Sequence, residues 1–221
     1  MSISSPQDAG PPPAAVAPGL RARKRERTRR TIARVALELF DRQGFHATTL
    51  AQIADAAEVS PRTVSAYFPA KEQLAFPDAA ETFDTLSARL RDRPAGERTA
   101  DALRDYIAAW LRAQEEDEPE RRVRRRVVDA DEGLLRYERH LMARAQEAIA
   151  ESIARDLGTA PDELEPRMAA ASAVAIFELL TRDVLPGDAG KTVDDQLRPV
   201  ERALAFIDGG IRACRADAPT G

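Results

Sequence analysis

The chain has 221 residues, of which 43% are hydrophobic and 5% aromatic, and a formal net charge of −4. One cysteine, Cys214, excludes an internal disulfide and fits a reducing compartment. No uncharged apolar run approaches the roughly 18 residues that a membrane span needs, and no signal-peptide pattern opens the chain. We therefore expect a cytoplasmic protein with no membrane partner. Abundant Ala, Leu, Glu and Arg favour helix over sheet and predict an all-α fold.

The N-terminal part divides into a leader and a basic segment. Residues 1–20 are rich in Pro, Ala and Gly, cannot bury a core, and predict a disordered leader. Residues 21–75 hold 11 Lys/Arg against 6 Asp/Glu, a net charge of +5, while the rest of the chain carries −9. This asymmetry indicates one end that binds a polyanion, with residues 21–30 as a basic arm. The alternative is a solvated helix start that only keeps the protein soluble.

Residues 28–74 read as short helices in helix-turn-helix spacing. Apolar residues recur three and four positions apart from Ile32 to Phe40, and Gly44 ends that helix. Thr49 and Gln52 can cap the second helix reciprocally. Ser60 is the expected N-cap of a third helix, with Pro61 at its first position. A short helix, a three-residue turn and another short helix form a helix-turn-helix.

This run resembles the DNA-binding domain of TetR (tetracycline-repressor) family regulators, in order and without gaps. The matching positions are Thr28, Arg29, Ile32, Ala36, Leu39, Phe40, Gly44, Phe45, Thr48, Thr49, Leu50, Ile53, Ala54, Ala57, Val59, Ser60, Arg62, Thr63, Val64, Tyr67, Phe68, Lys71, Glu72 and Leu74. Three residues depart from the family pattern. Glu58 replaces the usual Gly of the turn, a position that favours positive φ. Ser65 replaces a common aromatic, and Ala70 replaces a capping residue at a loss of about 1 kcal/mol.

The resemblance and helix geometry assign DNA contacts to this domain. The third helix enters the major groove with its N-terminal residues toward the bases, so Arg62, Thr63 and Ser65 are the predicted readers. Arg62 alone can make a bidentate contact to guanine. Val64 and Phe68 point inward. The resemblance places the remaining contacts near phosphates or the minor groove: Arg27, Thr28, Thr48, Thr49, Tyr67 and Lys71.

Residues 76–216 are predicted to form a helical ligand-binding and dimerisation domain. Pro77 breaks a helix that starts near Lys71, and further helices follow from Thr99 and over residues 134–157, the latter ended by Gly158. An acidic run at residues 115–120 is expected to be a turn. The arginine-rich run at 121–126 reads as a helix face that pairs with nearby acids, because no motif supports a second nucleic-acid contact.

The last two predicted helices suggest a dimer. Residues 168–180 are apolar nearly all round, which implies burial on two sides, and a single apolar seam runs from Leu197 to Ile211. Two such helices per chain can make a four-helix interface about a two-fold axis, as a TetR-like dimer does. The alternative is that both helices complete a monomer core. The predicted interface residues are Met168, Ala171, Ala175, Leu179, Val200, Leu204, Ile207 and Ile211.

The sequence offers little for catalysis. His46 and His140 lie far apart and outside metal-ligand spacing, and no Gly-rich phosphate loop is present, so we expect no enzyme, metal site or cofactor. The resemblance implies a small-molecule pocket between the helices that follow the DNA-binding domain. Its candidate wall residues, each also readable as ordinary core, are Phe83, Tyr106, Trp110, Tyr137 and Phe177.

These patterns and the resemblance to the TetR family together imply a homodimeric, sequence-specific transcriptional regulator. The resemblance implies a repressor that is released from a palindromic double-stranded DNA operator by an unidentified small-molecule inducer. The alternative hypothesis is a helical module that binds or sequesters a small molecule and has only non-specific affinity for DNA. Glu58 and Ser65 keep this alternative open, because both alter the part of the domain that reads sequence.

Overall fold

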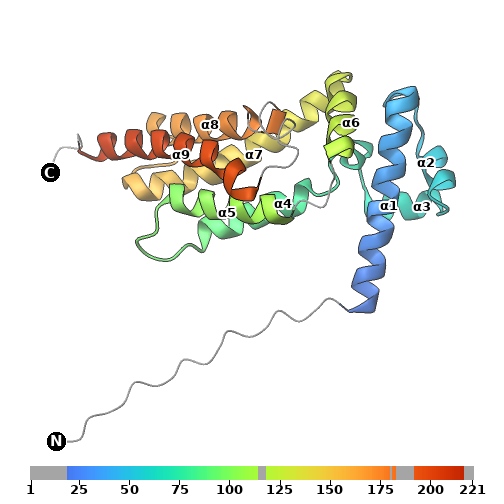
Figure 1. The fold of residues 1–221 in the computed structure, drawn as a ribbon, viewed down its shortest axis with the longest axis horizontal. Helices are drawn as coiled ribbons and strands as arrows, with labels where there is room; N and C mark the ends of the chain where they lie inside the picture. Colours follow the sequence, from blue (N-terminus) through green and yellow to red (C-terminus); the bar gives the residue numbers. More distant parts are fainter. Residues whose placement is uncertain (1–18, 114–117, 180, 183–191, 217–221) are drawn as a thin grey trace, which may run out of the picture.

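The computed structural model describes residues 19–113, 118–179, 181–182 and 192–216, and the regular elements in these ranges are all helical (Figure 1). This confirms the all-α prediction. The helices are α1 (Leu20–Gln43), α2 (Leu50–Ala56), α3 (Pro61–Tyr67), α4 (Ala79–Arg91), α5 (Thr99–Ala113), α6 (Glu118–Asp129), α7 (Glu132–Leu157), α8 (Leu164–Leu179) and α9 (Val193–Ala216), with one 3-10 turn at Lys71–Leu74. The first 18 residues of the leader, residues 115–117 of the acidic run, Leu180, the Pro186–Gly187 loop and the Cys214 side chain lie outside the description.

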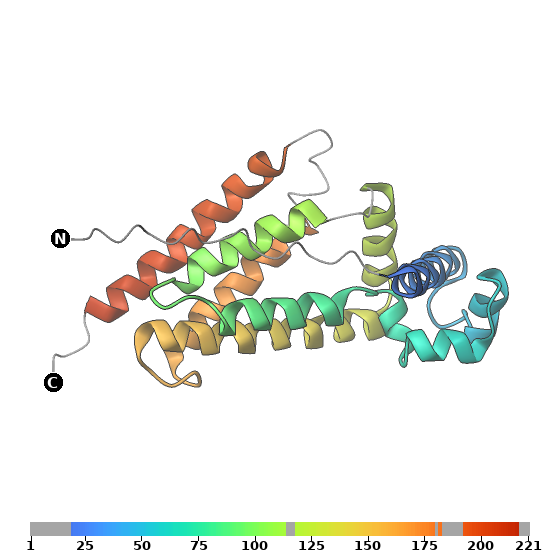
Figure 2. The same cartoon turned by 90° about the horizontal axis from the view of Figure 1, so that it is seen from below.

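Helices α1, α2 and α3 form an N-terminal unit at one end of the molecule (Figures 1 and 2). Its buried core includes Ile32, Phe40, Ile53 and Val64. The same cluster continues into Val127 and Val128 of α6 and Leu134 of α7. The N-terminal unit therefore does not close its core alone, since α6 lies against α1 and completes it.

The remaining helices form a bundle in which α7 contacts α4, α8 and α9, and α5 lies beside α9. A second buried cluster fills this bundle, with Phe83, Leu90, Ile153 and Val200 among its members. The long helix α7 ends where predicted, at Gly158, whose φ of 74° is the left-handed value that glycine adopts without strain.

Two predicted boundaries were wrong. A helix was expected to start near Lys71, but the chain makes one 3-10 turn there and α4 begins only at Ala79, beyond Pro77. Residues 118–120 were predicted to be part of a turn, but they form the first turn of α6. Pro119 is compatible with this position because the first turn of a helix leaves its N–H groups unpaired.

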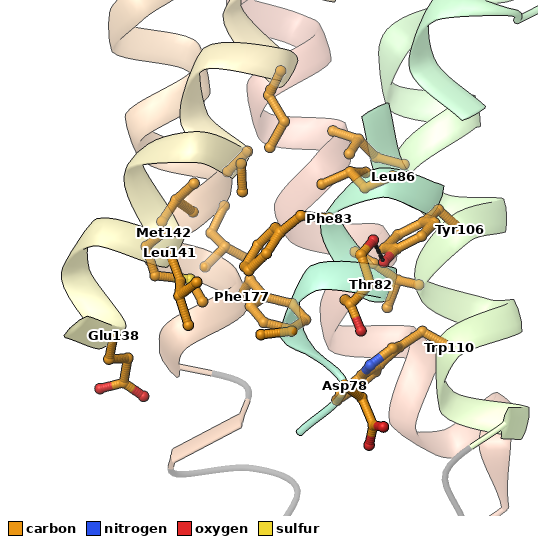
Figure 3. A pocket seen from close by; sticks show the side chains of 18 of the residues that line it. Asp78, Thr82, Phe83, Leu86, Tyr106, Trp110, Glu138, Leu141, Met142 and Phe177 are labelled. Carbon is orange, nitrogen blue, oxygen red and sulfur yellow. Dashed lines mark hydrogen bonds between the residues drawn. The ribbon is translucent and has the colours of Figure 1, made fainter. Parts of the chain in front are cut away.

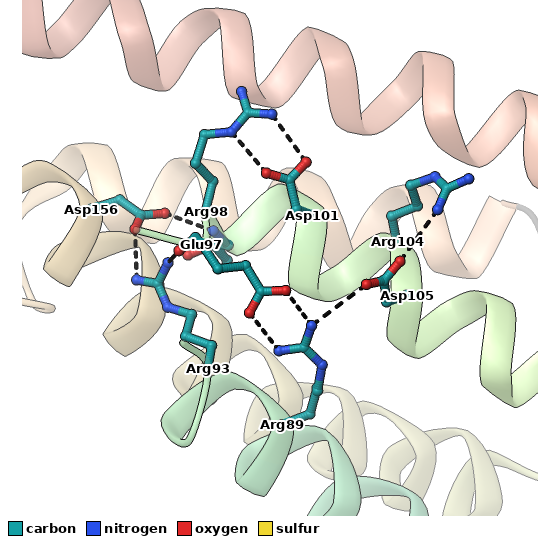
Figure 4. A network of polar contacts seen from close by, with 9 residues as sticks. Arg89, Arg93, Glu97, Arg98, Asp101, Arg104, Asp105 and Asp156 are labelled. Carbon is teal, nitrogen blue, oxygen red and sulfur yellow. Dashed lines mark hydrogen bonds and ion pairs between the residues drawn. The ribbon is translucent and has the colours of Figure 1, made fainter. Parts of the chain in front are cut away.

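A network of ion pairs fastens the α4–α5 connection to the bundle at the end away from the N-terminal unit (Figure 4). Arg93 Nη2 lies 2.6 Å from Asp156 Oδ1, and Asp156 Oδ2 accepts a 2.9 Å hydrogen bond from the Thr99 amide. Arg98 Nη1 lies 2.6 Å from the buried carboxylate of Asp208 on α9. These contacts fix the relative positions of α5, α7 and α9.

None of the described helices is both long and apolar enough to cross a membrane.

Candidate nucleic-acid interface and apolar cavity

The helix-turn-helix forms with the predicted caps. The Gln52 amide donates to Thr49 Oγ1 (3.2 Å), while Gln52 Oε1 accepts from the Thr49 amide (2.8 Å). Ser60 Oγ accepts from the Thr63 amide at 3.1 Å, and Pro61 occupies the first position of α3. Between the helices, Glu58 has a φ of 54°, as expected of a residue that replaces the turn glycine. The local chemistry predicted from the sequence is confirmed.

The exposed face of α3 carries the predicted readers. Arg62 and Ser65 are exposed, whereas Val64 and Phe68 are buried in the core. Thr63 is half-buried, and its hydroxyl lies 2.8 Å from Ser60 Oγ. An α3 docked in a major groove would therefore offer Arg62 and Ser65 to base edges most directly.

Two of the predicted phosphate contacts face inward. Thr48 is 1% exposed, and its hydroxyl donates to the Gly44 carbonyl at 2.8 Å and accepts from Gln43. Its assignment as a phosphate contact is therefore wrong, and Thr49 is the exposed threonine at the start of α2. Lys71 donates to the Phe45 carbonyl, and its ammonium lies 4.3 Å from the centroid of the Phe45 ring. Burial lowers the pKa of Lys71.

The basic arm is helical. It belongs to α1, which begins at Leu20 and projects beyond the N-terminal unit (Figure 1). Arg27 is exposed, and the hydroxyl of half-buried Thr28 donates to the Lys24 carbonyl at 3.0 Å. The guanidinium of Arg25 lies 5.7 Å from the centroid of the Tyr67 ring, which joins the arm to the C-terminal end of α3. The arm and α3 thus meet at Tyr67, and each carries exposed arginine, Arg27 on the arm and Arg62 on α3.

The bundle contains a cavity of about 250 Å³ between α4, α5, α7, α8 and α9 (Figure 3). Four of the five predicted wall residues line it: Phe83, Tyr106, Trp110 and Phe177. The rings of Trp110 and Phe177 meet edge to face at 5.4 Å. Tyr137 does not line the cavity, because its ring packs against Phe76 at 5.7 Å. That one assignment was wrong.

Polar groups gather at the end of the cavity nearer the N-terminal unit. Asp78 and Glu138 lie at this end, and apolar residues such as Leu86 line the cavity farther in (Figure 3). Arg124 also lines the cavity, and its Nη1 donates to the nearby Ala75 carbonyl at 2.7 Å. The Tyr106 hydroxyl donates to the Thr82 carbonyl at 2.7 Å, and burial raises the pKa of Tyr106 to about 12. An apolar cavity with a few convergent polar groups is the usual form of a small-molecule site.

The sequence analysis did not identify these three polar residues as cavity residues, because none of them belongs to the apolar spacing that predicts the helices. Asp78 precedes α4, Arg124 belongs to an arginine run, and Glu138 is one of many acids on α7. Charge alone could not separate them from solvated residues. No group of three or more His, Cys, Asp or Glu side chains suited to a metal ion occurs in the described ranges.

The predicted interface residues divide by helix. The α8 residues Met168, Ala171, Ala175 and Leu179 are exposed, Met168 and Leu179 by more than half of their surface. The four α9 residues are instead buried within the chain's own bundle, so their assignment to a partner-facing surface is wrong: Val200, Leu204, Ile207 and Ile211.

The exposed face of α9 carries other residues. Ala205 and Gly209 are exposed there, and Phe206 is 81% exposed. Helices α8 and α9 contact each other, and their exposed residues include large apolar and small side chains. We call the residues Met168, Ala171, Ala175, Leu179, Ala205, Phe206 and Gly209 the α8–α9 surface.

Comparison with known proteins agrees with this architecture. Residues 32–76 match the family described as bacterial regulatory proteins, tetR family, and residues 97–206 match the MftR C-terminal domain. The HTH-type transcriptional regulator TcmR of Streptomyces glaucescens is 35% identical over 176 residues, covering 75% of this chain and 76% of that protein. RutR of Escherichia coli is 33% identical over 93 residues, covering 42% of this chain and 44% of that protein.

Solved structures show the same fold. NalD of Pseudomonas aeruginosa, the secondary repressor of the MexAB-OprM multidrug efflux pump, superposes with a TM-score of 0.57 at 24% identity, covering 84% of this chain and 97% of that one. The family profiles and the similarity to TcmR cover the helix-turn-helix and most of the bundle. The chain belongs to the TetR family of bacterial DNA-binding transcriptional regulators.

Proposed function

We propose that this regulator is a homodimeric repressor that binds a palindromic operator and leaves it when a small molecule fills the cavity. The observation that carries the proposal is the combination of an exposed reading helix and an apolar cavity in one chain. A two-fold dimer provides two copies of α3, and paired reading helices suit half-sites about one DNA turn apart. The ligand acts only to the extent that it binds the DNA-free state more tightly.

The proposed dimer forms through the α8–α9 surface. Phe206, at 81% exposure, is the largest apolar side chain that this surface offers to a partner. Burying one Phe is worth about 1.5–3 kcal/mol, and a two-fold interface buries two copies. We therefore expect Phe206→Ser to raise the dimer dissociation constant by about a hundredfold or more, measured by sedimentation.

Leu20→Ser is the matched control for this measurement, because Leu20 is also 80% exposed but lies at the start of α1. It should leave the dimer intact. A Phe206→Ser chain that dimerises as tightly as the unchanged chain would contradict the proposed interface.

The experiment that tests the DNA proposal is a footprint on the DNA flanking the regulator's own gene, repeated over a series of salt concentrations. A protected inverted repeat would support a dimeric, sequence-specific regulator. Uniform weak binding that disappears with salt would instead favour the alternative, a small-molecule binding module with non-specific DNA affinity.

Arg62 is the residue with which to test sequence reading on that operator. Arg62→Ala should weaken operator binding by about 1–3 kcal/mol and relax base preference at one position of each half-site. Arg34→Ala is the control, because Arg34 is an exposed arginine of α1 that pairs with Glu38. Unchanged affinity and selectivity in Arg62→Ala would show that α3 reads the operator through other residues.

A further inference from the structure

Two arginines hold the segment that joins the N-terminal unit to the bundle, residues 75–78. Arg29, on α1, donates through Nη1 to the Pro77 carbonyl at 2.6 Å and pairs through Nη2 with the Asp78 carboxylate. Arg124, on α6, donates through Nη1 to the Ala75 carbonyl at 2.7 Å. The segment is thus held from α1 on one side and from α6 on the other.

Arg29 is fixed in this position from its own helix as well. Its side chain is 18% exposed, and its Nε lies 2.9 Å from Glu26 Oε2. The paired arginines lower the pKa of Glu26 to about 2, and its acidic partners raise the pKa of Arg29. Both groups therefore stay charged, and the fork of the guanidinium serves a carbonyl and two carboxylates at once.

The same segment is a wall of the cavity. Phe76, Pro77 and Asp78 line it together with Arg124, and Trp110 is a further lining residue (Figure 3). A ligand in the cavity therefore contacts the same residues that Arg29 holds, Pro77 through its backbone carbonyl and Asp78 through its carboxylate. Since α1 carries Ile32 and Phe40 in the core beneath α2 and α3, a change at Arg29 reaches the reading helix through packed contacts.

The charges around the cavity limit the chemistry of that ligand. Asp78 is paired with Arg29, and Glu138 with Arg125 at 2.8 Å and Arg182 at 3.2 Å. Arg124, the third charged residue of the lining, pairs with Glu120 at 3.4 Å. A charged ligand would have to compete with one of these pairs. A neutral aromatic body matches the rings of Phe83 and Phe177, and the Trp110 indole N–H can donate to an acceptor on it.

We propose that the ligand is a neutral aromatic molecule and that Arg29 is the positioning residue through which the filled cavity moves α1. In the structure the Arg29 fork holds Pro77 and Asp78 against α1. When a ligand fills the cavity, the first turn of α4 shifts and the Arg29 guanidinium loses its contacts to Pro77 and Asp78. Helix α1 then rotates together with α2 and α3. This inference rests on the proposed function and adds to it the ligand class and the contact that transmits binding.

The test uses the full-length dimer, the operator found by footprinting, and N-phenyl-1-naphthylamine as a neutral aromatic probe. Trp110 is the single tryptophan of the chain and lines the cavity, so energy transfer from Trp110 to the probe reports occupancy. Operator affinity is measured by fluorescence anisotropy with and without saturating probe. The ratio of the two dissociation constants is the coupling factor, which typically lies between about 5 and 150.

The variants are Arg29→Gln, which removes the fork, and Arg29→Lys, which keeps the charge but has a single donor group. We expect a coupling factor of at least about fivefold in the unchanged chain. It should fall below about twofold in Arg29→Gln, while probe affinity stays within about threefold, and Arg29→Lys should lie between. The control Arg34→Gln breaks an ion pair on the same helix and should keep the full factor.

The outcomes separate the two proposals. A factor that survives in Arg29→Gln would overturn the role of Arg29 and leave ligand-controlled release intact. Energy transfer without any coupling in the unchanged chain would refute ligand-controlled release itself. The absence of energy transfer would overturn the neutral aromatic class, and the absence of a sequence-specific operator would refute the DNA proposal.

Discussion

Glu58 makes the turn of the helix-turn-helix less stable than it could be. Its φ of 54° is in the left-handed region, where a residue with a β-carbon is disfavoured by roughly 1–2 kcal/mol. Glycine adopts this φ without that strain but loses more backbone entropy on folding, which costs about 0.5–1 kcal/mol. The Glu58→Gly variant should therefore be more stable than the unchanged protein, by about 0.5–1 kcal/mol.

Urea unfolding followed by circular dichroism measures this difference, with Glu58→Ala as the matched control. Alanine removes the carboxylate but keeps the β-carbon and so the strain, and should stay within about 0.5 kcal/mol of the unchanged protein because Glu58 is exposed. If Glu58→Gly were no more stable than Glu58→Ala, backbone strain at the turn would not be the cost that the φ value indicates.

Three further predictions concern stability. Leu134→Ala should lower the free energy of unfolding by about 2–5 kcal/mol and increase amide hydrogen exchange in α1 to α3, because Leu134 is fully buried in the cluster that these helices share. The control is Leu141→Ala, in the bundle cluster, which should leave the exchange rates of α1 to α3 unchanged. Thr49→Ala should cost about 1 kcal/mol in urea unfolding through loss of the α2 cap. The unfolded phenol of Tyr106 ionises near pH 10 and the buried one near 12, so its contribution to stability is complete below pH 10 and lost between 10 and 12. An absorbance titration of Tyr106→Phe should lack the step near pH 12.

Features decided by nearby residues were predictable from the sequence. The reciprocal cap of Thr49 and Gln52 and the Ser60 cap of α3 each involve residues three positions apart. The end of α7 at Gly158 needs only a residue that tolerates positive φ. The arginine run of α6 pairs with acids as predicted, for example Arg126 with Asp41 at 2.8 Å.

Features that depend on distant packing were not predictable. Thr48 and Thr49 are adjacent and chemically identical, yet one is buried and the other exposed, because Thr48 faces the end of α1. Arg29 read as part of a DNA-contacting arm, but its guanidinium reaches Asp78, 49 positions along the chain. Composition and periodicity carry no information about such pairings.

Helices α8 and α9 show what an apolar pattern can decide about a partner. A helix with a single apolar face can bury that face against only one set of neighbouring helices. In α9 the apolar face is buried against helices of the same chain. The side of α9 that remains exposed carries small residues and Phe206, which the spacing of apolar residues does not pick out. Helix α8 is apolar nearly all round. After one face has packed in the bundle, a second apolar face, which includes Met168 and Leu179, remains exposed. In a sequence, it is therefore a second apolar face on one helix that indicates a surface for another chain. A single apolar face indicates only packing within the chain.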